Sequence, residues 1–263
     1  MVGLVLRYSQ HMADLHAALK SGLSGQIVSL QANKHIARYH AAVFMRDWRM
    51  TDLTGGFLLE KCCHDIDIYT MVTGSRPNRA ASFGGRKSFF SANAPASNAE
   101  AEIFHVKKSV WNSVDDPCHS DGDIVDYRTT ILQYEIGATL AFFTNLNTPE
   151  RHRRFCVVGT HGMAEGDFVR SYLKITARDG TRLADHDHSQ GTTMRGAHYR
   201  ADQMMCADIA KYLRGQSKSL AVSILAAMEA GIAALAVDQA RNTGQMVDLT
   251  CSWAKLDACG LRK

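Results

Sequence analysis

The sequence predicts an α+β fold: a large, mostly antiparallel open sheet with helices packed on one face. Short strand patterns follow one another between Asp126 and Ile175 with no helix pattern between them, which is typical of an antiparallel sheet. The segment 224–243 is apolar almost all round, as expected of a helix buried between layers. With 263 residues and 46% hydrophobic content, the chain can form one large domain or two small ones.

The first 32 residues predict a strand, a helix and a second strand. The opening strand is expected at 2–8, and Ser9 is the expected N-cap of the helix that follows. Gly22 stands where a left-handed C-cap would end that helix, and the second strand is expected at 26–32.

The next hundred residues contain one clear helix and a long irregular segment. The Gly55-Gly56 pair indicates a loop, and 58–73 is predicted as a helix because Gly74 follows it directly. Residues 84–123 carry no regular pattern except a strand expected around 101–107. An irregular segment of that length is usually functional or mobile.

The most regular β pattern lies in the second half of the chain. Strands at 127–134 and 140–146 are expected to form an antiparallel hairpin. Further strands are expected at 155–158 and 172–176, and Asp179-Gly180 indicates a tight turn.

Two helices are expected to close the chain. Residues 200–213 place Ala201, Met204, Met205, Ile209 and Leu213 on one side. Residues 224–243 end at Gly244. Because these helices cover only one face of a broad sheet, we expect a homo-oligomer that packs through the other face.

Composition argues against several kinds of partner. A net charge of +4 is too small over this length to indicate nucleic acid or an anionic membrane, and no segment has the length of a membrane span. The basic run 151–154 is interpreted as a solvated loop or strand-edge patch in preference to a phosphate site. Seven cysteines without a CxxC pair, and an N-terminus unlike a signal peptide, predict reduced thiols and a cytoplasmic location.

The segment 60–67 concentrates reactive side chains. On a helix, Glu60 and His64 share a face, and so do Lys61 and Asp65. A carboxylate one turn from an imidazole can orient it and favour its protonated form, which suits general acid–base chemistry. The alternative is a helix N-terminus with ordinary charge pairs.

Other candidates are weaker. His198 precedes a helix and becomes of interest only if it faces His64. Arg46 and Trp48 lie in a segment suited to gripping a polar, hydroxylated ligand, although a surface ion cluster is the alternative. No metal site is expected, because the consecutive Cys62, Cys63 and His64 would point in three directions on a helix. The sequence contains no GxGxxG and no Walker motif.

Four segments carry a shared resemblance. They are SGLSGQIV (21–28), GGFLLEKCCHDID (55–67), GTHGMAEG (159–166) and VDQARNTGQMVDL (237–249). In this order they resemble the Gfo/Idh/MocA family of NAD(P)-dependent oxidoreductases, which includes glucose–fructose oxidoreductase and inositol dehydrogenase.

The resemblance implies a domain organisation. Family members have a nucleotide-binding Rossmann domain followed by an open-sheet domain, and this sequence resembles the second part. Residues 1–25 would be a remnant strand and helix of the nucleotide-binding domain, and 26–263 the substrate and oligomerisation domain. The glycine-rich fingerprint and the Glu-Lys-Pro motif would precede Met1. The implied cofactor is NAD or NADP, although no binding motif for it is present, so the chain is expected to be inactive alone.

The resemblance also implies residue roles. His64 matches the acid/base histidine, Glu60 the acidic partner that is usually Asp, and His198 a position that lines the sugar pocket. Lys61 can stand in for the missing lysine, or pair with Asp65. With Arg46 and Trp48, these residues predict a site for a small polyhydroxylated substrate. The alternative function is a non-catalytic binding or scaffold protein derived from this domain.

Overall fold

The computed structural model describes residues 3–46, 49–97, 102, 117–187 and 197–262. Its centre is a nine-stranded sheet with strand order β8-β7-β6-β5-β1-β4-β3-β2-β9. All neighbouring strands are antiparallel except β1 and β4, which confirms the mostly antiparallel sheet. The strands are β1 (Ile27–Ala37), β2 (Pro77–Gly85), β3 (Tyr127–Tyr134), β4 (Thr139–Thr148), β5 (Arg154–Gly159), β6 (Gly162–Asp167), β7 (Tyr172–Ala177), β8 (Arg182–Asp187) and β9 (Val247–Asp248).

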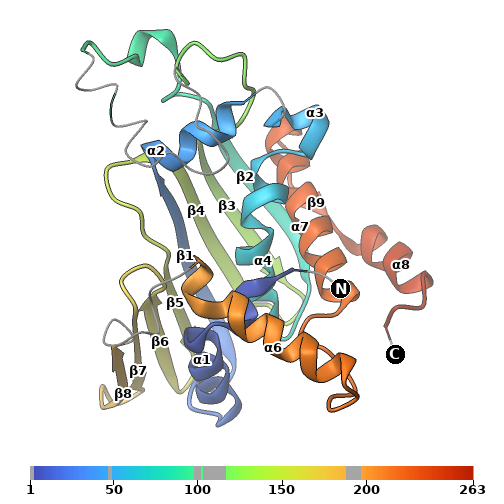
Figure 1. The fold of residues 1–263 in the computed structure, drawn as a ribbon. Coiled ribbons are helices and arrows are strands. Elements are labelled where there is room, and N and C mark those ends of the chain that lie inside the picture. Colours follow the sequence, from blue (N-terminus) through green and yellow to red (C-terminus); the bar gives the residue numbers. More distant parts are fainter. Residues whose placement is uncertain (1–2, 47–48, 98–101, 103–116, 188–196, 263) are drawn as a thin grey trace.

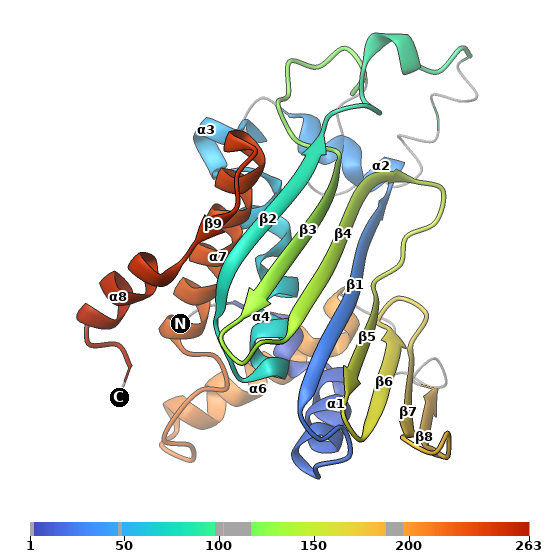
Figure 2. The ribbon, with the colours of Figure 1, turned by 180° about the vertical axis from the view of Figure 1, so that it is seen from behind.

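Helices lie on one face of this sheet, as predicted. Figure 1 shows α1, α4, α6 and α7 in front of the strands, and Figure 2 shows the opposite face without a helix over it. The helices are α1 (Gln10–Lys20), α2 (Arg38–Ala41), α3 (Thr51–Thr54), α4 (Cys63–Thr73), α6 (Ala201–Leu213), α7 (Ile224–Thr243) and α8 (Thr250–Ala258). A π-helical turn (Leu58–Cys62) leads into α4, and a 3-10 turn (Ala197–Arg200) leads into α6.

Alternation along the strands separates the two faces. Leu132, Leu140 and Phe142 are fully buried beneath the helices, whereas Phe83 and Ile131 are 72% and 43% exposed on the bare face. Because side chains of a strand alternate between faces, the helices collect one apolar set and leave the other uncovered.

Two ion pairs hold the start of α4. Asp65, which is 1% exposed, accepts from Nε of Arg153 at 2.6 Å, and Arg153 is itself only 4% exposed. Asp67 accepts two bonds from Arg7, at 2.7 Å from Nε and 2.6 Å from Nη2. The first pair ties α4 to the segment that enters β5, and the second ties it to the N-terminal 3-10 turn. Both fix the position of His64, one residue before Asp65.

Several local predictions are confirmed. Ser9 caps α1, accepting from the backbone N–H of Met12, and Gly22 has a φ of +80° just after the helix. The expected hairpin is β3 and β4. The helix predicted at 58–73 is present, although its first turn is π-helical rather than α-helical, and Gly74 ends it in the left-handed region.

Other local predictions are wrong. Residues Val5–Tyr8 form a 3-10 turn and not a strand. They lie against α6 and α4 and away from any strand edge, so no ladder is offered to them. Strands β2, β6, β8 and β9 and helix α8 were not predicted. The strand expected around 101–107 lies outside the described residues apart from Glu102, which is not in a strand.

The two predicted C-terminal helices are less buried than expected. Helix α7 is not buried all round: its inner face is mostly alanine, and Met228 and Leu235 are exposed. Small side chains let α7 approach β2 and α4 closely, so its larger residues are directed outwards. In α6 only Ala201 is fully buried, and Met204 and Leu213 of the predicted apolar side are exposed.

Asp65→Asn is expected to lower the free energy of unfolding by about 3–5 kcal/mol, because it leaves Arg153 buried without its carboxylate partner. Urea unfolding would measure the loss. Asp185→Asn, at an exposed position of β8, is the matched control and should have little effect. A double variant, Asp65→Asn with Arg153→Met, should lose less than Asp65→Asn alone. Equal stability of the Asp65 and Asp185 variants would contradict this role for the pair.

Candidate functional site

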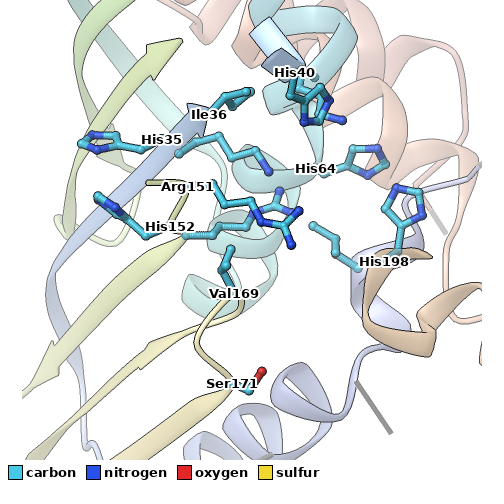
Figure 3. Close-up of a pocket in the computed structure, with 13 residues that line it drawn as sticks. His35, Ile36, His40, His64, Arg151, His152, Val169, Ser171 and His198 are labelled. Atoms are coloured by element: carbon cyan, nitrogen blue, oxygen red, sulfur yellow. The ribbon is translucent and has the colours of Figure 1, made fainter. Parts of the chain in front are cut away.

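A cavity of about 380 Å³ opens on the helix-covered face of the sheet, where α4 meets β1. It is bounded by the N-terminal 3-10 turn, by β1, by the start of α4, by the segment before β5 and by the turn before α6. Its lining residues are Leu6, Lys34, His35, Ile36, His40, Lys61, His64, Arg151, His152, Arg153, Val169, Ser171 and His198. Figure 3 shows that His40, His64 and His198 gather on one side of it. The structure thus brings together segments that are far apart in the sequence.

His64 lies at this cavity, and its imidazole is mostly buried. Burial lowers the pKa of His64 to about 4, and the positive charge of Arg153 lowers it further than Asp65 raises it. The expectation that Glu60 favours the protonated form is therefore wrong. His64 is a neutral imidazole at pH 7, and its Nδ1 has no hydrogen-bond partner among the described residues. That nitrogen is itself buried, so what the cavity offers a substrate is the rest of a neutral imidazole, which can accept a proton.

His198 faces His64 across the cavity. The centroids of the two rings are 6.5 Å apart, and Nδ1 of His198 lies 2.9 Å from the carboxylate of Asp202. His198 and Arg200 both have left-handed backbone conformations, with φ of +51° and +63°. Non-glycine residues rarely adopt that conformation, and such strain concentrates at functional sites. His198 therefore faces His64, which was the condition for treating it as a candidate site residue.

Lys61 also lines the cavity, and it makes no salt bridge to Asp65 in the described structure. Asp65 is paired with Arg153 instead. Burial would raise the pKa of Asp65, but Arg153 and Lys34 together hold it below its ordinary value. Burial and the nearby Arg153 lower the pKa of Lys61. The predicted salt bridge between Lys61 and Asp65 does not form, because the guanidinium of Arg153 pairs with the Asp65 carboxylate.

The sequence analysis missed Lys34. It projects from β1 on the same face as the buried Ala32, and burial lowers its pKa to about 7. Its signal was available in retrospect: Leu30, Ala32 and Ile36 place position 34 on the inward face of an alternating strand. A lysine at an inward position of such a strand is unexpected and needs an explanation.

The interpretation of the basic run 151–154 as a solvated patch is wrong in part. Arg151 and Arg153 line the cavity, and Arg153 is buried, while Arg154 is exposed. The side chain of His152 points away from the cavity, to the bare sheet face, where its ring lies 4.2 Å from that of His35 (Figure 3). Alternation at the entrance to β5 sends consecutive basic residues to opposite faces of the sheet.

Two predicted site residues lie elsewhere, and a third is not described. Glu60 is not a lining residue; its carboxylate accepts from Arg49 at 2.6 Å. Burial nevertheless raises the pKa of Glu60 above its ordinary value, against the effect of Arg49. Arg46 follows a 3-10 turn (Ala42–Met45) and does not line this cavity. Trp48 lies outside the described residues.

The residues that the structure describes contain no cluster of three or more potential metal ligands, and none of their helices is long and apolar enough to cross a bilayer. Nor do they fit a whole dinucleotide. A dinucleotide fold needs a glycine-rich turn from a strand into a helix between parallel strands. Here the single parallel pair among the described strands is β1–β4, and Gly159 and Gly162 flank an antiparallel turn. We therefore assign no residue to a nucleotide.

The fold and the cavity together define an open-sheet α+β domain with a cavity on its helix-covered face. The model of the GFO/IDH/MocA C-terminal domain matches residues 12–165, more than half of the chain. The chain belongs to the GFO/IDH/MocA family.

Known proteins agree with this membership. YteT of Bacillus subtilis (strain 168), whose name presents it as a candidate oxidoreductase, is 21% identical over 277 residues, which cover 89% of this chain and 64% of YteT. Levoglucosan dehydrogenase, solved with NADH and levoglucosan, is 14% identical with a TM-score of 0.71 over 95% of this chain and 66% of that one. Aldose-aldose oxidoreductase from Caulobacter crescentus, solved with glycerol, is 15% identical with a TM-score of 0.64 over 95% and 63%. The chain thus spans less than two thirds of each of these proteins.

The neutral state of His64 can be measured directly. In an NMR titration of the histidine Cε1–H signals, with His64→Gln to assign the peak, His64 should titrate at about 4 in the native protein. In urea the same residue should titrate near 6.5, because the burial is lost. The unfolded chain then takes up this proton first, so His64 should cost stability as the pH falls from about 6.5 to 4. A native value near 6.5 would contradict the buried, neutral imidazole.

Proposed function

We propose that this chain forms the substrate-binding part of an NAD(P)-dependent sugar or cyclitol oxidoreductase, and that His64 accepts the proton of a substrate hydroxyl. The observation that carries the proposal is the neutral His64 imidazole, which lines the cavity and faces His198. Family membership and the activities named for the similar structures support the reaction class. The cavity volume of about 380 Å³ suits a single sugar ring.

The proposed roles follow the geometry. His64 takes the hydroxyl proton, and His198, held by Asp202, contacts the substrate from the opposite side. Lys61 contacts the substrate from α4's side of the cavity. Glu60 acts as a positioning residue, because it ties the π-helical turn before His64 to Arg49. When bound, a nicotinamide would accept the hydride from the carbon whose hydroxyl His64 deprotonates.

The nucleotide would be held outside the described residues. We propose that residues 26–263 are the substrate and oligomerisation domain and that residues 1–25 connect to a nucleotide-binding domain. The salt bridge of Arg7 with Asp67 supports such a connection, because it fixes the N-terminal turn beside the catalytic helix.

We also propose a homo-oligomer that packs through the bare sheet face. Phe83, Ile131, Phe143 and Val158 are exposed there on four strands of the sheet. An apolar face of this extent is typical of a surface that another protein covers.

Activity should appear when the chain follows a family nucleotide-binding domain in a chimaera. We expect NAD(P)⁺ reduction, followed at 340 nm, with at least one member of a panel of sugars and cyclitols. His64→Asn should lower kcat about 10²–10⁴-fold, because it removes the proton acceptor. His161→Asn, outside the cavity, is the matched control. A folded chimaera that reduces NAD(P)⁺ equally well with His64→Asn would contradict the role of His64.

Static light scattering should show a mass above that of one chain. Phe83→Asp combined with Ile131→Asp should give a monomer, because two buried charges would oppose packing of the sheet faces. Leu53→Asp, at an exposed apolar position on α3, should leave the mass unchanged. A monomeric parent chain would refute the assembly.

A further inference from the structure

The cavity at His64 is strongly biased in charge. Four of its lining side chains are cationic, namely Lys34, Lys61, Arg151 and Arg153, and no Asp or Glu in the described part of the chain lines it. Two carboxylates lie behind lining residues: Asp65 is paired with Arg153, and Asp202 contacts His198. The pairing of Asp65 with Arg153 leaves Lys34, Lys61 and Arg151 without an ion-pair partner among the described residues. Among the described residues, the four cations exceed these two carboxylates by two charges when both lysines are protonated.

Keeping the two lysines charged is energetically unfavourable. Burial lowers the pKa of Lys34 to about 7 and also lowers the pKa of Lys61; Arg153 adds to both shifts, and Asp65, already paired with Arg153, opposes both. Burying an ammonium group without a counter-charge is unfavourable, and a second cation beside it makes this worse. Lys34 lies on β1 and Lys61 in the π-helical turn before α4, and neither makes an ion pair among the described residues. Removing the charges would stabilise the empty protein, so a ligand is the physical reason to keep them.

The chemistry that satisfies these groups is an anion. A bound carboxylate or phosphate accepts charge-assisted hydrogen bonds from both ammonium groups and restores their ordinary protonation. The histidines are suited to a different part of the ligand. His40 and His64 are neutral at pH 7, because burial lowers their pKa values to about 3 and about 4. Neutral imidazoles pair with hydroxyl groups, so the cavity offers an anion-binding part and a hydroxyl-binding part.

We propose that the cavity takes a polyhydroxylated ligand that carries a carboxylate or a phosphate, a sugar acid or a sugar phosphate, with Lys34 and Lys61 holding the anionic group. The position of a ligand hydroxyl at His64 rests on the proposed function; the anionic group does not. Arg151, at the exposed rim, adds to the attraction of an anion from solution.

Isothermal titration of the 263-residue chain without cofactor tests this inference. The probes are D-glucuronate, D-glucose 6-phosphate, D-glucose, inorganic phosphate and NAD⁺. We expect at least one of the two anionic sugars to bind about tenfold or more tightly than D-glucose. The preference should weaken when NaCl is raised from about 50 to about 500 mM, because the cavity is open to solvent. Bound ligand should also raise Tm.

Variants separate the lysines from general charge. Lys34→Met and Lys61→Met keep an apolar stem, and each should lose about tenfold in affinity for the anionic sugar with little change for glucose. Each should also keep or raise the Tm of the ligand-free protein, because a buried charge is removed. Lys255→Met on α8 makes the same charge change at an exposed position and should leave binding unchanged.

The inference would be overturned if glucose bound as tightly as both anionic sugars, or if both lysine variants bound the anionic sugar as tightly as the parent chain. It would also be overturned if inorganic phosphate bound as tightly as either anionic sugar, which would mean an adventitious anion site. Binding of NAD⁺ without binding of either anionic sugar would overturn it too, because the cations would then serve the nucleotide, and the proposed oxidoreductase would still stand. Tight, lysine-dependent binding of an anionic sugar with an inactive chimaera would support the ligand class and count against the proposed reaction.

Discussion

The buried pair of Asp65 and Arg153 is the interaction on which the site depends. It joins α4 to the chain just before β5, across the helix-covered face of the sheet, and it sets His64 at the edge of the cavity between these elements. It also balances one of the four cationic groups that would otherwise repel one another there. Arg7 and Asp67 brace the same helix from the N-terminal side. The position of His64 and the charge around it therefore have a common origin.

Burial near positive charge lowers the pKa of both the histidines and the lysines at the cavity, but it leaves them with different charges. Burial beside fixed guanidinium charge disfavours every additional proton, so His64 and His40 stay neutral while Lys34 is brought close to its titration point. The site thus combines neutral bases with cations that are only partly neutralised. Under the proposed function, the neutral bases would remove the proton and the cations would select the substrate, so the two tasks would fall to separate groups in one small cavity.

The sequence predicted the class of fold and the position of His64, because both depend on local pattern. Alternation gave β3 and β4, and Ser9 and Gly22 marked the ends of α1. The sequence did not predict the ion-pair partners of the carboxylates at the site. Asp65 has Lys61 one turn away but binds Arg153, 88 residues further on, and Glu60 binds Arg49. Which side chain meets a buried carboxylate is decided by packing of distant elements, and a single sequence carries no record of that. Lys34 is different, because the alternation of Leu30, Ala32 and Ile36 does place it on the inward face, and only the charges around it depend on distant segments.

The position of β1 in the sheet has a consequence for biosynthesis. It is the first strand in the chain and lies in the middle of the sheet, between β4 and β5, so Leu30 pairs with Leu140 on one side and Val157 on the other. Neither neighbour exists while the ribosome is still making the first half of the chain. The β3–β4 hairpin can close by itself as it emerges, but the early strand must wait with its backbone amides unpaired until the later ones arrive. During that interval the apolar start of the chain is exposed to solvent and to other nascent chains, and chaperones would act on it there.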